Sequence, residues 1–141
     1  MRKKSNLYIL VLSNGGYDGL GKQREKEMEK AAAELKFKGF KVVDDERLQD
    51  GPVNHWQPEH VAEHIEKYIA ELKTKKVDIG TLVTFDDSGI SGHPNHIQVY
   101  FGCKHLYDSA RLPHLDLYTL QTVNLIRKYI GFFDSLFISS S

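Results

Sequence analysis

Hydrophobic and polar positions alternate along the chain in blocks of two kinds. Short apolar runs, typical of strands buried on both faces, occur at residues 7–12, 40–43, 77–85 and 115–120. Longer charged segments with apolar residues at helical spacing occur at 22–38, from Pro58 onward, and from Pro94 to about Ser109. This order predicts an α/β fold, a Rossmann-like three-layer parallel sheet with helices on both faces.

Glycine and proline mark the ends of the helical segments. Gly39 follows the first segment, as glycine commonly does beyond a helix C-terminus. Pro58 and Pro94 open the second and third, at a position where the missing N–H costs nothing. The second helix has the clearest core face, formed by Val61, Ile65, Tyr68, Ile69 and Leu72.

Composition and charge narrow the class of protein. A length of 141 residues with 40% hydrophobic residues, without repeat or linker, predicts one domain over residues 1–141. Basic and acidic side chains both number 19, so nothing in the charge favours a nucleic-acid partner. The apolar run at 7–12 is far shorter than the roughly 20 residues of a membrane span. Cys103, the only cysteine, excludes an intrachain disulfide and is interpreted as a core residue.

Two polar, glycine-rich loops follow strands of this predicted sheet, at 13–21 and 85–93. Ligands of parallel α/β sheets bind beyond the carboxyl ends of the strands, so the site is expected there. In the first loop, Asn14 precedes Gly15 and Gly16, which either let a ligand approach the backbone or form a flexible turn. Arg24 follows in the next helix, either as a clamp for an anionic group or as a solvated side chain.

The strongest local signal is Gly-His-Pro-Asn-His at 92–96, which follows a strand and opens a helix. His93 and His96 are three residues apart and therefore neighbours on the helix surface. One imidazole can ligate a metal while the other exchanges a proton with the reacting group. A histidine cap followed by a surface histidine is the alternative interpretation, and spacing alone does not separate the two.

Other acidic and histidine side chains are less specific. Asp86 and Asp87, at the end of the third strand, could hold a metal, act as a base or orient a histidine. They could equally cap the loop or the next helix. His60 and His64 lie four apart on the second helix and are interpreted as solvated surface.

The segment 84–96 resembles the N-acetylglucosaminyl-phosphatidylinositol de-N-acetylases, which are LmbE-like zinc deacetylases. Supporting stretches occur in the same order at 12–15, 21–27, 112–113, 119–124 and 127–129. The resemblance implies hydrolysis of an acetyl group from the glycolipid during GPI-anchor biosynthesis, by a zinc-bound water. It also implies a membrane surface as partner and a location on the cytoplasmic face of the endoplasmic reticulum membrane.

By this resemblance His96 is a zinc ligand and His93 assists the tetrahedral intermediate and the leaving amine. Arg24 is a substrate contact, and we predict Asn14 as a second one. We predict Asp87 as the aspartate that acts with His93 in catalysis.

The sequence departs from the family pattern at its start. The family begins with a strand and an Ala-His-Pro-Asp-Asp-Glu type motif, which supplies two zinc ligands and the general base. Nothing of that kind precedes Leu7, so we expect the first strand of the family fold to be missing and the chain alone to be inactive or nearly so. The acidic segment 43–46 is interpreted as a surface turn.

Two alternative functions remain open. One is a soluble deacetylase of another N-acetylglucosaminyl conjugate, which would share the mechanism and differ only in substrate. The other is a fragment that binds a sugar without catalysis.

Overall fold

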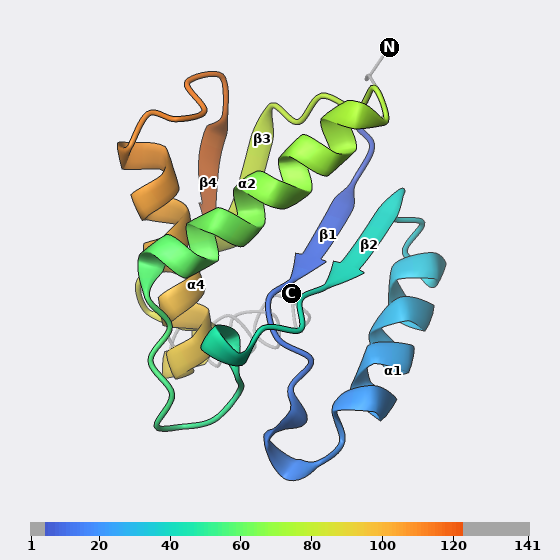
Figure 1. Cartoon of the computed structure of the whole chain (residues 1–141), viewed down its shortest axis with the longest axis vertical. Coiled ribbons are helices and arrows are strands. Elements are labelled where there is room, and N and C mark those ends of the chain that lie inside the picture. Colours follow the sequence, from blue (N-terminus) through green and yellow to red (C-terminus); the bar gives the residue numbers. More distant parts are fainter. Residues whose placement is uncertain (1–4, 123–141) are drawn as a thin grey trace, which may run out of the picture.

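The computed structural model describes residues 5–122, and its elements follow the predicted order (Figure 1). The strands are β1 (Tyr8–Val11), β2 (Gly39–Val42), β3 (Thr81–Phe85) and β4 (Asp116–Leu120). The long helices are α1 (Gly21–Glu34), α2 (Pro58–Thr74) and α4 (Pro94–Asp108). Short turns of helix are η1 (Gly16–Asp18), η2 (Glu46–Leu48) and α3 (Gly89–Gly92). The α/β class is thereby confirmed.

The four strands form two parallel pairs. β1 pairs with β2, from Tyr8 opposite Gly39 to Val11 opposite Val42. β3 pairs with β4, from Thr81 opposite Asp116 to Phe85 opposite Leu120. Parallel pairing is as predicted, but within residues 5–122 the strands make two two-stranded sheets, because β1 and β3 are not joined to each other.

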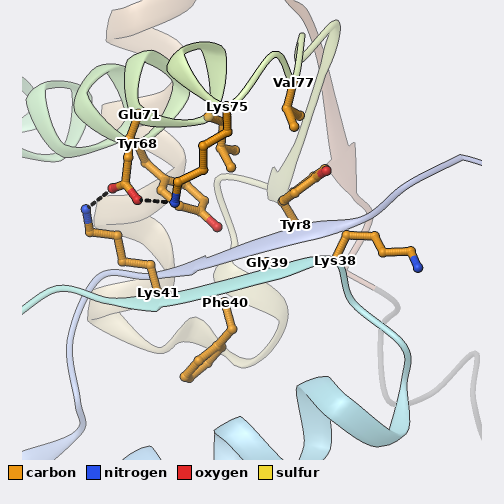
Figure 2. Close-up of a pocket in the computed structure, with 10 residues that line it drawn as sticks. Tyr8, Lys38, Gly39, Phe40, Lys41, Tyr68, Glu71, Lys75 and Val77 are labelled. Atoms are coloured by element: carbon orange, nitrogen blue, oxygen red, sulfur yellow. Dashed lines mark hydrogen bonds and ion pairs between the residues drawn. The ribbon is translucent and has the colours of Figure 1, made fainter.

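Helices lie on both faces of the strands. Figure 2 shows Lys41 directed toward α2 and Phe40, the preceding residue of β2, directed toward α1. This is the alternation of side chains that a strand imposes. α2 packs along α4, and α4 packs on β3 and β4. The three layers predicted from the sequence are therefore present.

One hydrophobic core joins the two sheets. Its buried members come from the strand ends, the 43–56 segment, α2 and α4: Leu12, Val43, Leu48, Trp56, Val61, Ala62, Ile65, Cys103, Leu106 and Leu115. Burial of a side chain such as Val61 or Leu106 contributes about 1.5–3 kcal/mol to the free energy of unfolding. Burial also raises the pKa of the Cys103 thiol to about 11, so this cysteine is a core residue as predicted.

The contact between α2 and α4 depends on a glycine. A Cβ atom on Gly102 would lie 2.2 Å from Cγ1 of Val61, which is fully buried. Gly102 therefore allows the two helices to approach closely. The N-terminal end of α4 belongs to the segment that follows β3, so this contact bears on where that segment lies. Within residues 5–122 no helix is both long enough and apolar enough to cross a bilayer.

Candidate active site at the carboxyl ends of the strands

The loop after β3 is fixed by Asp86. Its carboxylate accepts hydrogen bonds from the hydroxyl and the backbone N–H of Thr122, both at 2.5 Å, and from the N–H of Ser88 at 3.2 Å. The hydrogen bonds from Thr122 lower the pKa of Asp86. Asp87 is exposed, and its one hydrogen bond among residues 5–122 is a 3.3 Å bond from the Ser88 hydroxyl. Within this part of the chain Asp87 is the less engaged of the two carboxylates, and its catalytic role stays a prediction.

His96 is held in one orientation by the turn that precedes α4. Its Nδ1 lies 3.1 Å from the carbonyl oxygen of Gly89, and its ring stacks on Phe85 with centroids 4.1 Å apart. A carbonyl only accepts, so Nδ1 carries the proton and the lone pair is on Nε2. A backbone carbonyl on one nitrogen is the usual way in which proteins orient a histidine that binds a metal through the other.

Gly89 makes this contact possible. Its φ is 58°, a left-handed conformation that favours glycine, and a Cβ atom there would lie 2.8 Å from Ile97 and 3.1 Å from Cβ of His96. Any larger residue would push the first turn of α4 away from the loop.

His93 and His96 lie side by side, with ring centroids 4.8 Å apart. His93 occupies the N-cap position of α4 and is exposed, whereas His96 is partly buried. The arrangement pairs one fixed imidazole with one accessible imidazole. The roles predicted for them, a metal ligand and a proton-transfer group, are compatible with this arrangement and stay predictions.

The loop after β1 brings Asn14 and Arg24 together. The Asn14 side chain lies so close to Gly16 that a Cβ atom there would be 2.8 Å from its Oδ1. Arg24 crosses Gly15 and donates a 2.9 Å hydrogen bond to Asp18. Both line a cavity of about 530 Å³. Because Arg24 and Asp18 are about half exposed, their ion pair is weak, and an anionic ligand could replace Asp18 as the partner.

A second cavity, of about 520 Å³, lies where β1 and β2 end. Its polar lining includes Asn14, Tyr17, Asp44, Asp50 and Asn54. No sequence pattern predicted Asp50, Tyr17 and Asn54, because isolated polar residues in loops carry no spacing signal. The one available hint was Gly51-Pro52 directly after an aspartate, which is typical of an ordered turn.

Asp50 connects this cavity to the histidine segment. Its Oδ1 accepts a 2.5 Å hydrogen bond from the Nδ2 of Asn95, which lies between His93 and His96. Asn95 is buried, and its Oδ1 has no hydrogen-bond partner among residues 5–122. The same loop is held to α4 by Gln98, which donates to the carbonyl of Asn54 at 3.1 Å. The loops after β2 and β3 therefore form one continuous surface.

The acidic segment after β2 leads into η2 with Asp44 and Glu46 exposed, as a surface turn would, but it corrects the interpretation of His64. Asp45 accepts hydrogen bonds from Arg47 and lies 2.8 Å from Nε2 of His64. The bonds from Arg47 hold the pKa of Asp45 far below its usual range. His64, interpreted as solvated, is only 16% exposed because it packs against this carboxylate. The pair fastens η2 to α2 and is structural.

At the opposite end of the strands lies the cavity of Figure 2, of about 400 Å³. Tyr8, Tyr68 and three lysines line it, and its acidic residue is Glu71. Glu71 contacts Lys41 at 2.5 Å and Lys75 at 2.9 Å, which lowers its pKa to about 2. The carboxylate of Glu71 is thus already paired with two lysines, and no histidine lines this cavity, so we do not place the reaction here.

The described residues do not by themselves fit a catalytic metal. Such an ion needs about three protein ligands. Within residues 5–122 no group of three or more His, Cys, Asp or Glu side chains is placed to hold one. His96 has the chemistry and the orientation of a single ligand. No described hydrogen bond or ion pair joins it to Asn14 or Arg24.

Comparison with known proteins gives a consistent result. Residues 1–107 match the family described as PIG-L, GlcNAc-PI de-N-acetylase. A probable N-acetylglucosaminyl-phosphatidylinositol de-N-acetylase of Schizosaccharomyces pombe is 41% identical over 134 residues, covering 94% of this chain and 51% of that protein. The N-acetylglucosaminyl-phosphatidylinositol de-N-acetylase of Bos taurus is 30% identical, covering 94% and 52%. The chain thus spans about half the length of these relatives, and no solved structure matches it.

Proposed function

The chain belongs to the GlcNAc-PI de-N-acetylase family, and we propose that it is part of an enzyme that hydrolyses the acetyl group from N-acetylglucosaminyl-phosphatidylinositol in GPI-anchor biosynthesis. The observation that carries the proposal is the histidine pair at the carboxyl end of β3. His96 is fixed by Gly89, and His93 lies accessible 4.8 Å away.

The reaction adds water to the acetamide carbonyl, breaks the carbon–nitrogen bond, and leaves acetate and a free amine. The amine nitrogen must gain a proton as it leaves. An exposed imidazole such as His93 can hold that proton and deliver it, since histidine titrates near neutral pH. Asp87, an exposed carboxylate at the start of the same loop, could orient an imidazole or accept a proton from water.

The two loop cavities supply candidate contacts for the rest of the substrate. The sugar carries hydroxyl groups, which the carboxylate of Asp50 and the amides of Asn14 and Asn54 could bind. The phosphate is an anion, which the guanidinium of Arg24 could bind in place of Asp18. These assignments follow from chemistry and position.

A divalent metal, by resemblance zinc, belongs to the proposal, with Nε2 of His96 as one ligand. Bound there, it would polarise the carbonyl and lower the pKa of a bound water. The remaining ligands would come from outside residues 5–122. We also propose, from the glycolipid substrate, action at a membrane surface on the cytoplasmic face of the endoplasmic reticulum. The formal net charge is zero, so it gives no reason to propose a nucleic-acid partner.

The incomplete ligand set favours one second candidate: a chain that binds the sugar without hydrolysing it. A soluble N-acetylglucosaminyl conjugate is a further alternative substrate, because the described site has no feature that recognises lipid.

The test uses the 141-residue chain and a chimera in which it replaces the matching segment of the Schizosaccharomyces pombe relative. Acetate release is measured from N-acetylglucosaminyl-phosphatidylinositol and from its water-soluble, deacylated headgroup, with and without added zinc. We expect the chimera to release acetate from the glycolipid. A folded, zinc-loaded chimera that leaves the glycolipid intact would contradict the proposal, and hydrolysis of the soluble headgroup alone would favour the second substrate class. Binding without acetate release by either protein would favour the sugar-binding alternative.

A further inference from the structure

The segment that joins η2 to α2, residues 49–57, is a loop whose shape is set by its own side chains. The side-chain amide of Asn54 donates hydrogen bonds to the carbonyls of Gln49 at 3.3 Å and of Asp50 at 2.9 Å. The indole N–H of Trp56 donates to the carbonyl of Gln49 at 2.9 Å. These bonds fold the 49–57 loop on itself, so its position relative to the histidine segment depends on how it is attached to α4, which lies beside it (Figure 1).

Gln98 of α4 makes most of this attachment. Its Oε1 accepts a 3.2 Å hydrogen bond from the backbone N–H of Trp56. Its Nε2 donates to the carbonyl of Asn54 at 3.1 Å and lies 3.4 Å from Nδ1 of His55. A backbone N–H only donates and a carbonyl only accepts, so a single orientation of the Gln98 amide satisfies both. Gln98 therefore holds residues 54–56, which lie 42 to 44 positions earlier in the chain.

Within residues 5–122, Asn95 supplies the other hydrogen bond between α4 and the 49–57 loop, from its Nδ2 to Oδ1 of Asp50. Asn95 and Gln98 are three residues apart and therefore neighbours on one face of α4. His93 and His96 lie at the same end of this helix. The 49–57 loop and the histidine pair are thus attached to the same end of one rigid element.

This attachment leaves one oxygen of Asp50 for a ligand. Its Oδ1 accepts hydrogen bonds from Asn95 and from the N–H of Gly51, the latter at 3.0 Å. No hydrogen bond within residues 5–122 engages its Oδ2, and Asp50 lines the cavity of about 520 Å³. An ionised carboxylate oxygen only accepts, so the group that Oδ2 binds must be a donor, such as a sugar hydroxyl.

We propose that Gln98 is a positioning residue: by holding the 49–57 loop on α4, it fixes the carboxylate of Asp50 at a set distance from the imidazole of His93. The inference rests on the proposed function, in which Asp50 binds a sugar hydroxyl and His93 protonates the leaving amine. Hydroxyl and acetamide are carried by one sugar ring, so the groups that bind them must also keep a constant separation. Loops move more readily than helices, and Gln98 removes this freedom without touching the substrate.

The first test uses Trp56, the only tryptophan of the chain, which is buried and belongs to the 49–57 loop. In the 141-residue chain, Gln98→Ala should raise the acrylamide quenching constant of its fluorescence at least about twofold, because the released loop opens locally. The control is Lys104→Ala, which removes an exposed ion pair with Asp108 on the same helix and should leave quenching unchanged. Quenching of Gln98→Ala equal to that of the parent would overturn the proposal.

The second test measures acetate release by the chimera from the deacylated headgroup. Gln98→Ala should raise KM at least about fivefold and change kcat less than about threefold, because a weakened hydroxyl contact is lost from ground state and transition state alike. A purely structural role would lower the melting temperature and leave KM unchanged wherever the variant is folded. Gln98→Glu is the second variant: it keeps an acceptor for Trp56 but loses the donor to Asn54, so its KM should also rise. An unchanged KM in both folded variants would overturn the proposal.

A double variant shows whether Gln98 acts through Asp50. In the Asp50→Ala background, Gln98→Ala should change KM less than about twofold, because the contact that it positions is already absent. An undiminished rise of KM in that background would overturn the proposal. A parent chimera that releases no acetate would contradict the proposed function instead, and the quenching of Trp56 would still decide whether Gln98 holds the loop.

Discussion

The two ends of the strands carry cavities of similar size that differ in how far their polar groups are satisfied. The amino-end cavity, of about 400 Å³, holds Glu71 between Lys41 and Lys75 (Figure 2). The carboxyl-end cavity, of about 520 Å³, adjoins the histidine segment, where Oδ1 of Asn95 has no partner within residues 5–122. Volume does not distinguish a functional site here, whereas unsatisfied and oriented polar atoms do.

The direction of the chain explains the difference. In a parallel sheet the helices end at the amino ends of the strands, where cations are favoured by the helix dipole. Lys73 and Lys75 lie at such an end, that of α2. The helices begin at the carboxyl ends of the strands. Side chains in the loops there are not needed to pair with a helix C-terminus.

The largest effect is expected at His96. In the chimera, His96→Ala should reduce acetate release at least about a hundredfold, because it removes the oriented ligand. The matched control is His114→Ala, an exposed histidine in the loop before β4, which should stay within about twofold of the parent. Equal losses of acetate release for the two variants would contradict the assignment of the reaction to the carboxyl ends of the strands.

Gly102→Ala should lower the free energy of unfolding, because Gly102 lies at the contact between α2 and α4. The added methyl would lie 2.2 Å from the Val61 side chain, and overpacking of this kind costs about 1–3 kcal/mol. Because the added Cβ would overlap two atoms of the fully buried Val61, we expect a cost in the upper part of this range, which exceeds the gain of about 1 kcal/mol from replacing glycine within a helix. Gly80→Ala is the control, since its Cβ meets no atom within 4 Å. Urea unfolding should show a loss for the first variant only, and equal stability of both would contradict the packing argument.

A pair of double-mutant cycles should separate the partly buried contact from the exposed one. Asp50→Ala and Asn95→Ala should show a coupling free energy of about 1–2 kcal/mol, because their bond is charge-assisted and Asn95 is buried. Lys41→Ala and Glu71→Ala should show a smaller coupling that salt weakens, since both side chains are exposed. A larger coupling at the exposed pair would reverse the comparison.

The smallest effect is expected from acid. The hydrogen bond from Lys41 lowers the pKa of Glu71 from 4.5 to about 2 in the folded state, so this carboxylate contributes stability above pH 4.5 and loses it as the pH falls toward 2. Glu71→Gln should lower the melting temperature slightly at pH 6. The difference from the parent chain should vanish near pH 2, and a constant difference across that range would contradict the assignment.

Features with local causes were predictable from the sequence. Pro58 and Pro94 open α2 and α4 as expected, since proline at the first helical position acts through its own backbone. The strand predicted at 115–120 is β4 (Asp116–Leu120), one residue shorter, because a short apolar run is itself a local pattern. α1 ends at Glu34, four residues earlier than predicted, because the left-handed Lys36 already turns the chain toward β2.

Local patterning and one specific segment were therefore enough to predict the α/β order of elements, the two loops that hold candidate chemistry and the family resemblance. The contacts of His96 with Gly89, of Asp50 with Asn95 and of His64 with Asp45 became visible with the folded structure. The last two contacts join residues 45 and 19 positions apart. Separate loops meet in this way only after the strands and helices have packed, and no spacing rule within the chain specifies which polar groups will pair.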